Sequence, residues 1–157
     1  MRQSIMTRCL DPRSQAGSNA RRFCLVAVLL CLVTGHGIAF AEPPSIGDRA
    51  PDFTLSTPTG PRVQLSKLVG RSTVILVVLR GFPGYQCPYC QKQVHDFIEH
   101  SSGFAMKKAF VLLVYPGPSA DLDQHAREFL AKQANLPTNI TLVADPDYVM
   151  TNRYGLR

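Results

Sequence analysis

Two apolar stretches, at residues 73–79 and 109–114, constrain the fold of this chain more than any other feature. Both are rich in β-branched residues and Leu, so we predict two strands that are buried on both faces of a sheet. The alternation of such strands with amphipathic helices predicts an α/β domain whose central, mostly parallel sheet is flanked by helices. The helical stripes are Cys90, Val94, Phe97 and Ile98 after the first stretch, and Leu122, Ala126, Phe129, Leu130 and Ala134 after the second.

Shorter elements complete the expected order. Residues 53–55 and 62–65 alternate apolar and polar side chains around a turn rich in Pro and Gly, which predicts an N-terminal hairpin. The chain of 157 residues argues for one domain, with the order β-β-β-α-β-α-β-α. We also expect a helical turn at 66–70, helices that begin after Cys87 and Ser119, a strand break at Tyr115, a strand at 140–143, and a last helix at 147–154.

The first 41 residues have the features of an export signal. Arg21 and Arg22 precede an apolar run at 23–33, and Ala39 and Ala41 form a small-x-small cleavage site. The run is shorter than the roughly 20 apolar residues of a spanning helix. We therefore predict a signal peptide at 1–41, a linker at 42–51, a domain at 52–157 and an exported, periplasmic protein. The alternative is an uncleaved signal that anchors the chain in the membrane.

Removal of this leader changes the charge and the cysteine count. The chain has 17 Lys and Arg against 11 Asp and Glu, but the leader holds five Arg and one Asp. The rest is close to neutral and lacks a basic stripe with interleaved aromatic residues, so we expect no nucleic-acid partner. Three of the five cysteines also lie in the leader, which leaves only Cys87 and Cys90.

These two cysteines form a Cys-Pro-Tyr-Cys motif between a predicted strand and a predicted helix. At the start of the helix, Cys87 would face unpaired backbone N–H groups, which favour the nucleophilic thiolate. Cys90 lies one turn further along, so we predict that Cys87 attacks and Cys90 resolves the mixed disulfide or sulfenic acid. Pro88 suits the first helical turn because its missing N–H costs nothing there.

Metal binding is the alternative use of such a pair. A closed zinc site needs four converging ligands, and the domain offers no second cysteine pair. A copper site with both cysteines and one His stays open. We interpret the three histidines as solvated surface residues and predict neither a bound metal nor a cofactor. The histidines of the domain are His95, His100 and His125.

Four segments resemble the alkyl hydroperoxide reductase / thiol-specific antioxidant family, which is peroxiredoxin-like and belongs to the thioredoxin-fold superfamily. They are residues 46–55, residues 66–68, the strand and Arg80-Gly81 ahead of Cys87-Pro-Tyr-Cys90, and residues 144–155 with their Asp-Pro-Asp and Tyr-Gly pairs. The resemblance spans about residues 45–157. It implies a thioredoxin-like fold, a hydroperoxide substrate, and a thiol reductant such as a thioredoxin-like protein.

Two departures from the family pattern matter. No Ser or Thr lies between Thr73 and Cys87, so the hydroxyl expected to orient the peroxide is not identifiable. Tyr85 or Gln86 are the candidates to replace it, and Arg80 is the candidate to neutralise the thiolate. The family fold also adds two strands and a helix after the last helix of this chain. We therefore expect a domain that is incomplete at its C-terminus, with residues 74–79 at an unpaired sheet edge.

Three classes of function follow from these features. We favour a thiol peroxidase over an exported thiol-disulfide oxidoreductase that acts on protein disulfides. A metal carrier, or a remnant with a structural disulfide, is the non-enzymatic alternative. The predicted catalytic residues are Cys87 and Cys90, and the predicted supporting residues are Arg80, Pro88 and Tyr85.

Overall fold

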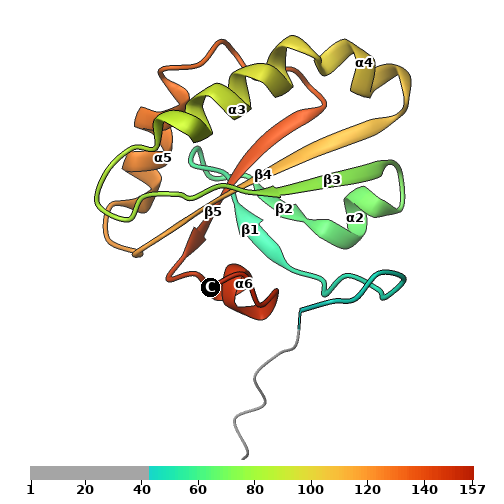
Figure 1. The fold of residues 1–157 in the computed structure, drawn as a ribbon, viewed down its shortest axis with the longest axis horizontal. Helices are drawn as coiled ribbons and strands as arrows, with labels where there is room; N and C mark the ends of the chain where they lie inside the picture. The colour runs from blue at the N-terminus through green and yellow to red at the C-terminus, as the bar shows by residue number, and fades with distance from the viewer. Residues whose placement is uncertain (1–42) are drawn as a thin grey trace, which may run out of the picture. The chain divides into compact units, whose positions relative to one another are not determined.

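The computed structural model describes residues 43–157 (Figure 1). The predicted signal peptide at 1–41 lies outside the described residues. The elements in chain order are β1 (Thr54–Ser56), β2 (Arg62–Gln64), α2 (Leu65–Val69), β3 (Thr73–Val78), α3 (Pro88–Glu99), α4 (Ser101–Met106), β4 (Ala109–Gly117), α5 (Leu122–Leu130), β5 (Ile140–Pro146) and α6 (Val149–Arg153).

The five strands form one sheet in the order β2-β1-β5-β4-β3. β3, β4 and β5 are parallel, and β1 runs antiparallel to both β2 and β5. In Figure 1, α3 and α5 lie on one side of this sheet, with α2 and α6 on the other. The predicted α/β fold with a mostly parallel sheet and an N-terminal hairpin is confirmed.

The sheet separates two apolar cores that share β4. Leu113 and Tyr115 point toward α3 and α5, whereas Leu112 and Val114 point toward α2 and α6. This alternation is the side-chain period of an extended strand. From Val111 onward every residue of β4 is buried, as a central strand requires. The prediction of burial on both faces is therefore confirmed for this strand.

The prediction was wrong for β3, whose residues after Thr73 are only half-buried. Within residues 43–157, β3 pairs with β4 alone and forms one edge of the sheet. The expectation that residues 74–79 lie at an unpaired sheet edge is confirmed for the described residues. An edge strand keeps one side open to solvent, which is why β3 is less buried than its apolar composition predicts.

Several boundaries also differ from the expected ones. β4 continues through Tyr115 to Gly117, because β5 extends to Pro146 and pairs with it. α5 begins at Leu122 after Asp121, which has a left-handed φ of 57°. Ser119 does not cap α5; its N–H donates to the Asp147 carboxylate at 2.9 Å.

A buried carboxylate attaches the last helix to the sheet. Asp145, at the end of β5, accepts hydrogen bonds from the backbone N–H groups of Met150 and Thr151, each at 2.8 Å, and from the Thr151 hydroxyl at 2.7 Å. Such donors satisfy a carboxylate that is fully buried. In the described part of the chain, no helix is both long and apolar enough to cross a membrane.

Candidate active site

The two cysteines lie where the chain leaves the sheet and enters α3. Cys87 is the N-cap residue of α3 and Pro88 is the first helical residue, as predicted. The Cys87 sulfur accepts the backbone N–H of Cys90 at 3.4 Å. The sulfur thus takes the place of the capping oxygen that usually satisfies the first turn of a helix.

Cys90 lies one turn further into α3 and faces the sheet. Its sulfur accepts the backbone N–H of Arg80 at 3.4 Å, which connects the end of β3 to the helix. Both cysteines are free thiols in this structure. They are also recessed, since Cys87 is 5% exposed and Cys90 is 8% exposed.

The surroundings shift the pKa values of the two thiols in opposite directions. Burial is the largest single influence on Cys87 and raises its pKa. It is outweighed by hydrogen bonds from Cys90 and Tyr89 and by the charge of Arg80, so that the pKa is lowered overall. For Cys90 burial dominates, and the pKa of its thiol is raised. Cys87 is therefore the thiol that ionises first, and Cys90 stays protonated longer.

The loop between β3 and α3 lies tightly against β4 because of a glycine. Gly81 has a φ of 71°, and a Cβ atom there would lie 1.7 Å from the carbonyl oxygen of Pro116. The next residue, Phe82, donates its N–H to the same oxygen at 3.0 Å. Only a residue without a side chain permits this approach, which explains the Arg80-Gly81 pair.

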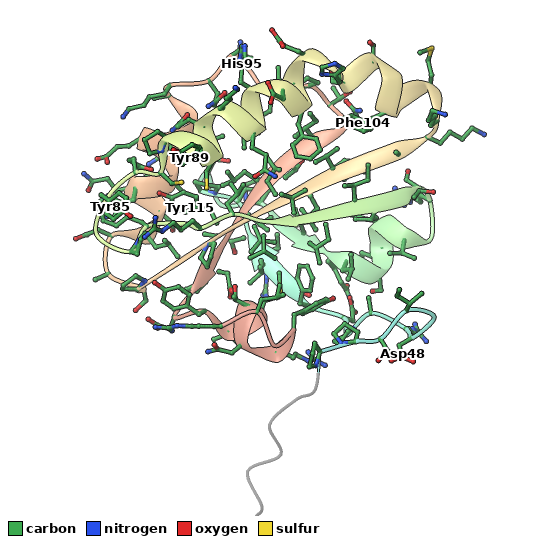
Figure 2. All side chains as sticks on the ribbon, in the orientation of Figure 1. Asp48, Tyr85, Tyr89, His95, Phe104 and Tyr115 are labelled. Atoms are coloured by element: carbon green, nitrogen blue, oxygen red, sulfur yellow. The ribbon has the colours of Figure 1, made fainter. Side chains whose placement is uncertain are left out.

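Tyrosine side chains lie near the start of α3 (Figure 2). The Arg80 guanidinium carbon lies 4.8 Å from the centre of the Tyr85 ring, a cation–π distance. Tyr85 is 49% exposed and Tyr89 is 85% exposed. Figure 2 shows Tyr85, Tyr89 and Tyr115 at the same end of the molecule, around the start of α3.

Tyr115, and its contact with the candidate residue Gln86, were not predicted from the sequence and lie behind the loop. The Tyr115 hydroxyl donates to the Gln86 side-chain oxygen at 2.8 Å, and the Gln86 amide nitrogen donates to the His125 carbonyl at 2.9 Å. One signal pointed to Tyr115: it follows a predicted strand at the carboxyl edge of the sheet, where the loop before Cys87 also begins.

The three histidines of the domain differ in their exposure to solvent. His95 and His100 are exposed, as interpreted from the sequence. The interpretation was wrong for His125, which is half-buried with its ring stacked on Phe82, the ring centres being 3.6 Å apart. Among residues 43–157, no three His, Cys, Asp or Glu side chains are grouped so that they could hold a metal ion.

Comparison with known proteins identifies the family. The model of the AhpC/TSA family matches residues 46–157. The chain belongs to the AhpC/TSA family. A protein of Helicobacter pylori strain J99 that carries the name peroxiredoxin bcp is 32% identical to this AhpC/TSA chain over 113 residues. The match covers 72% of this chain and 67% of that protein. A Coxiella burnetii protein with the same name is also 32% identical, over 111 residues, covering 71% and 66%.

Solved structures show the fold of the chain. The peroxidoxin BcpB of Mycobacterium tuberculosis superposes with a TM-score of 0.56 at 23% identity, covering 69% of this chain and 64% of that one. A Chlorobium tepidum protein assigned as the thiol:disulfide interchange protein DsbE has a TM-score of 0.54 at 28% identity, covering 71% and 70%. The AhpC/TSA chain thus has a thioredoxin-like fold and is an oxidoreductase.

Proposed function

We propose that this AhpC/TSA chain is a thiol peroxidase in which Cys87 is the nucleophile and Cys90 is the resolving cysteine. The observation that carries the proposal is the difference between the two thiols. The Cys87 sulfur caps α3 with its pKa lowered, whereas burial raises the pKa of the Cys90 thiol. A peroxidase cycle needs one thiol that is ionised before the peroxide arrives. It also needs a second thiol that attacks the first sulfur after that sulfur has been oxidised.

In the first step the Cys87 thiolate attacks the terminal oxygen of a hydroperoxide. A sulfur–oxygen bond forms as the oxygen–oxygen bond breaks, so that the sulfur is oxidised to a sulfenic acid and the peroxide is reduced. The leaving alkoxide or hydroxide takes a proton from solvent. Arg80, whose charge already lowers the pKa of Cys87, stabilises the negative charge during this transfer. Tyr85 holds the Arg80 guanidinium against its ring.

In the second step the Cys90 thiol loses its proton and attacks the oxidised sulfur of Cys87. The disulfide forms, the sulfur–oxygen bond breaks, and the departing hydroxide combines with the proton as water. Pro88 stiffens the turn that separates the two sulfurs. Two thiols of an external reductant, such as a thioredoxin-like protein, then reduce the disulfide and complete the cycle.

The second candidate is thiol–disulfide exchange with protein disulfides. The likeness to the DsbE protein, at 28% identity, favours it, and the same two cysteines would serve. The recessed Cys87 sulfur favours the peroxidase, because a hydroperoxide is small enough to reach a 5% exposed residue, whereas a protein disulfide must dock over it. A metal carrier, the third possibility from the sequence, has no further support.

We also propose that the protein is exported. The support is the leader-like sequence of residues 1–41, with its paired arginines, apolar run and small-x-small site. Residues 42–51 would then link the signal peptide to the thioredoxin-like domain at 52–157. N-terminal sequencing of the protein recovered from the periplasm tests this, with Glu42 as the expected first residue.

Trapping of the intermediate tests the assigned roles. Reduced full-length chain is treated with hydrogen peroxide and dimedone, and the adduct is located by mass spectrometry. Cys90→Ser should accumulate the adduct on Cys87, because the proposed resolving thiol is missing, and Cys87→Ser should form no adduct at this motif. Cys9→Ser is the matched control and should behave as the unmodified chain. Equal amounts of dimedone adduct on Cys90 in Cys87→Ser and on Cys87 in Cys90→Ser would contradict the assignment.

A further inference from the structure

One side chain of the active-site loop, Gln86, is hydrogen-bonded to two other elements of the domain. The Gln86 oxygen accepts from the Tyr115 hydroxyl at 2.8 Å, and the Gln86 nitrogen donates to the His125 carbonyl at 2.9 Å. The orientation of this amide is determined, because a backbone carbonyl can only accept and must therefore face the NH2 group. The amide oxygen is then left for Tyr115, whose hydroxyl must donate. Gln86 thus connects the loop to β4 and to α5.

Tyr115 and His125, the two residues that Gln86 contacts, each pack against an aromatic ring. Tyr115 is 1% exposed, and its ring lies 5.2 Å from the ring of Phe129, centre to centre. Burial raises the pKa of Tyr115 to about 12, so that the hydroxyl keeps its proton and remains a donor. On the other side, the His125 ring stacks on Phe82, which belongs to the same loop.

The hydrogen bonds of Gln86 bear on Cys87 because the two residues are adjacent in the chain. Gln86 directly precedes Cys87, whose sulfur must stay above the first turn of α3 to accept the N–H of Cys90. We propose that Gln86 and Tyr115 are positioning residues, which hold the backbone ahead of Cys87 so that its sulfur remains at the start of α3. This inference rests on the proposed role of Cys87 as nucleophile.

Loss of the two bonds should move the sulfur without altering the nearby charges. The charged and titratable groups around this region are Arg80, Glu128, His125, Tyr85, Tyr115 and the two cysteines. Substitutions at Gln86 and Tyr115 leave Arg80 and Glu128 in place. A changed acidity of Cys87 in such variants would therefore report a displaced sulfur, which meets fewer N–H groups of the first turn.

The experiment measures that acidity directly in the full-length reduced chain. The rate of alkylation of Cys87 by iodoacetamide is followed against pH. Chymotryptic cleavage after Tyr89 separates the Cys87 peptide from Cys90, and mass spectrometry then distinguishes it from the peptides of the other four cysteines. Gln86→Met keeps the length of the side chain but removes both hydrogen bonds, and Tyr115→Phe removes one. Each should raise the pH midpoint by roughly half a unit to one unit. The double variant should exceed the larger single effect by little, because both residues act through one connection.

Gln91→Met is the matched control. The Gln91 amide donates to the Phe129 carbonyl at 3.1 Å and so also connects to α5, but from within α3. In this variant the pH midpoint of Cys87 alkylation should equal that of the unmodified chain. An unchanged midpoint in folded Gln86→Met and Tyr115→Phe would overturn the proposal. If Gln86→Met fails to fold, Tyr115→Phe decides alone, because it removes a single oxygen atom. Alkylation needs no peroxide, so the result is readable even if the proposed function is wrong.

Discussion

Gly81 determines how closely the active-site loop can approach the sheet. Its backbone is in the left-handed region, and the carbonyl of Pro116 occupies the space of the missing side chain. This contact brings Arg80 to the position from which its N–H reaches the Cys90 sulfur. Gly81 therefore links the end of β3, where the loop begins, to Cys90, the thiol that we propose as the resolving cysteine.

Replacement of Gly81 by Ala should destabilise the domain. The combined clash and positive φ should lower the free energy of unfolding by about 2 kcal/mol or more. Urea unfolding of the full chain measures this, with Gly103→Ala as the control. Gly103 lies inside α4, and a Cβ there meets nothing within 4 Å, so that variant should gain about 0.5–1 kcal/mol. Equal stability of the two variants would contradict the account of the loop.

At the scale of elements, Asp52 joins the hairpin to the first helix. Its carboxylate accepts hydrogen bonds from the side chain of Gln64, at the end of β2, and from the N–H and hydroxyl of Ser66 in α2, each at 2.8 Å. These bonds lower the pKa of Asp52 from 3.8 to about 2, and the Gln64 bond has the largest effect.

Because the folded pKa of Asp52 is depressed, its contribution to stability is present above pH 3.8 and is lost as the pH falls toward 2. Asp52→Asn cannot titrate, and its NH2 group cannot accept from Ser66. We therefore expect the variant to be less stable than the unmodified chain at pH 6, and this difference to shrink as the pH falls to 2. Urea midpoints at both pH values measure it. A difference that is constant with pH would show that the Asp52 carboxylate does not have this role.

Comparison of elements also shows what the sequence could predict. Periodicity reports burial, so the alternation of strands and helices and the capping position of Cys87 could be predicted. The family resemblance also placed residues 74–79 at an unpaired sheet edge, where β3 lies, whereas the apolar composition of β3 led us to overestimate its burial. The start of α5 was missed because the Ser119 N–H bonds to Asp147, which lies 28 residues away. The Gln86–Tyr115 bond, across 29 residues, was missed for the same reason.

In the whole domain, the sheet separates two cores, and only one of them contains the two cysteines. Leu113 packs in the core that contains Cys87 and Cys90, whereas Leu112 packs in the core beneath α2 and α6. Both leucines are fully buried on the same strand.

These two leucines therefore form a matched pair. Leu112→Ala and Leu113→Ala should each cost about 2–5 kcal/mol of unfolding free energy, since each leaves a cavity in a packed core. Only Leu113→Ala should also change the alkylation rate of Cys87, because only that cavity lies under the site. Calorimetry and alkylation of the full chain measure the two effects. Equal changes of Cys87 reactivity in both variants would show that the two cores do not act separately.

The rate constant for the reaction of the reduced full-length chain with hydrogen peroxide at pH 7 tests the central claim most directly. A free cysteine thiol is only a few per cent thiolate at this pH, so complete ionisation alone accelerates it by at most about 30-fold. We predict a rate at least about a hundredfold above that of free cysteine, since Arg80 would also stabilise the charge that develops in the transition state. A rate equal to that of free cysteine would contradict the assignment of Cys87 as a peroxide-reducing nucleophile.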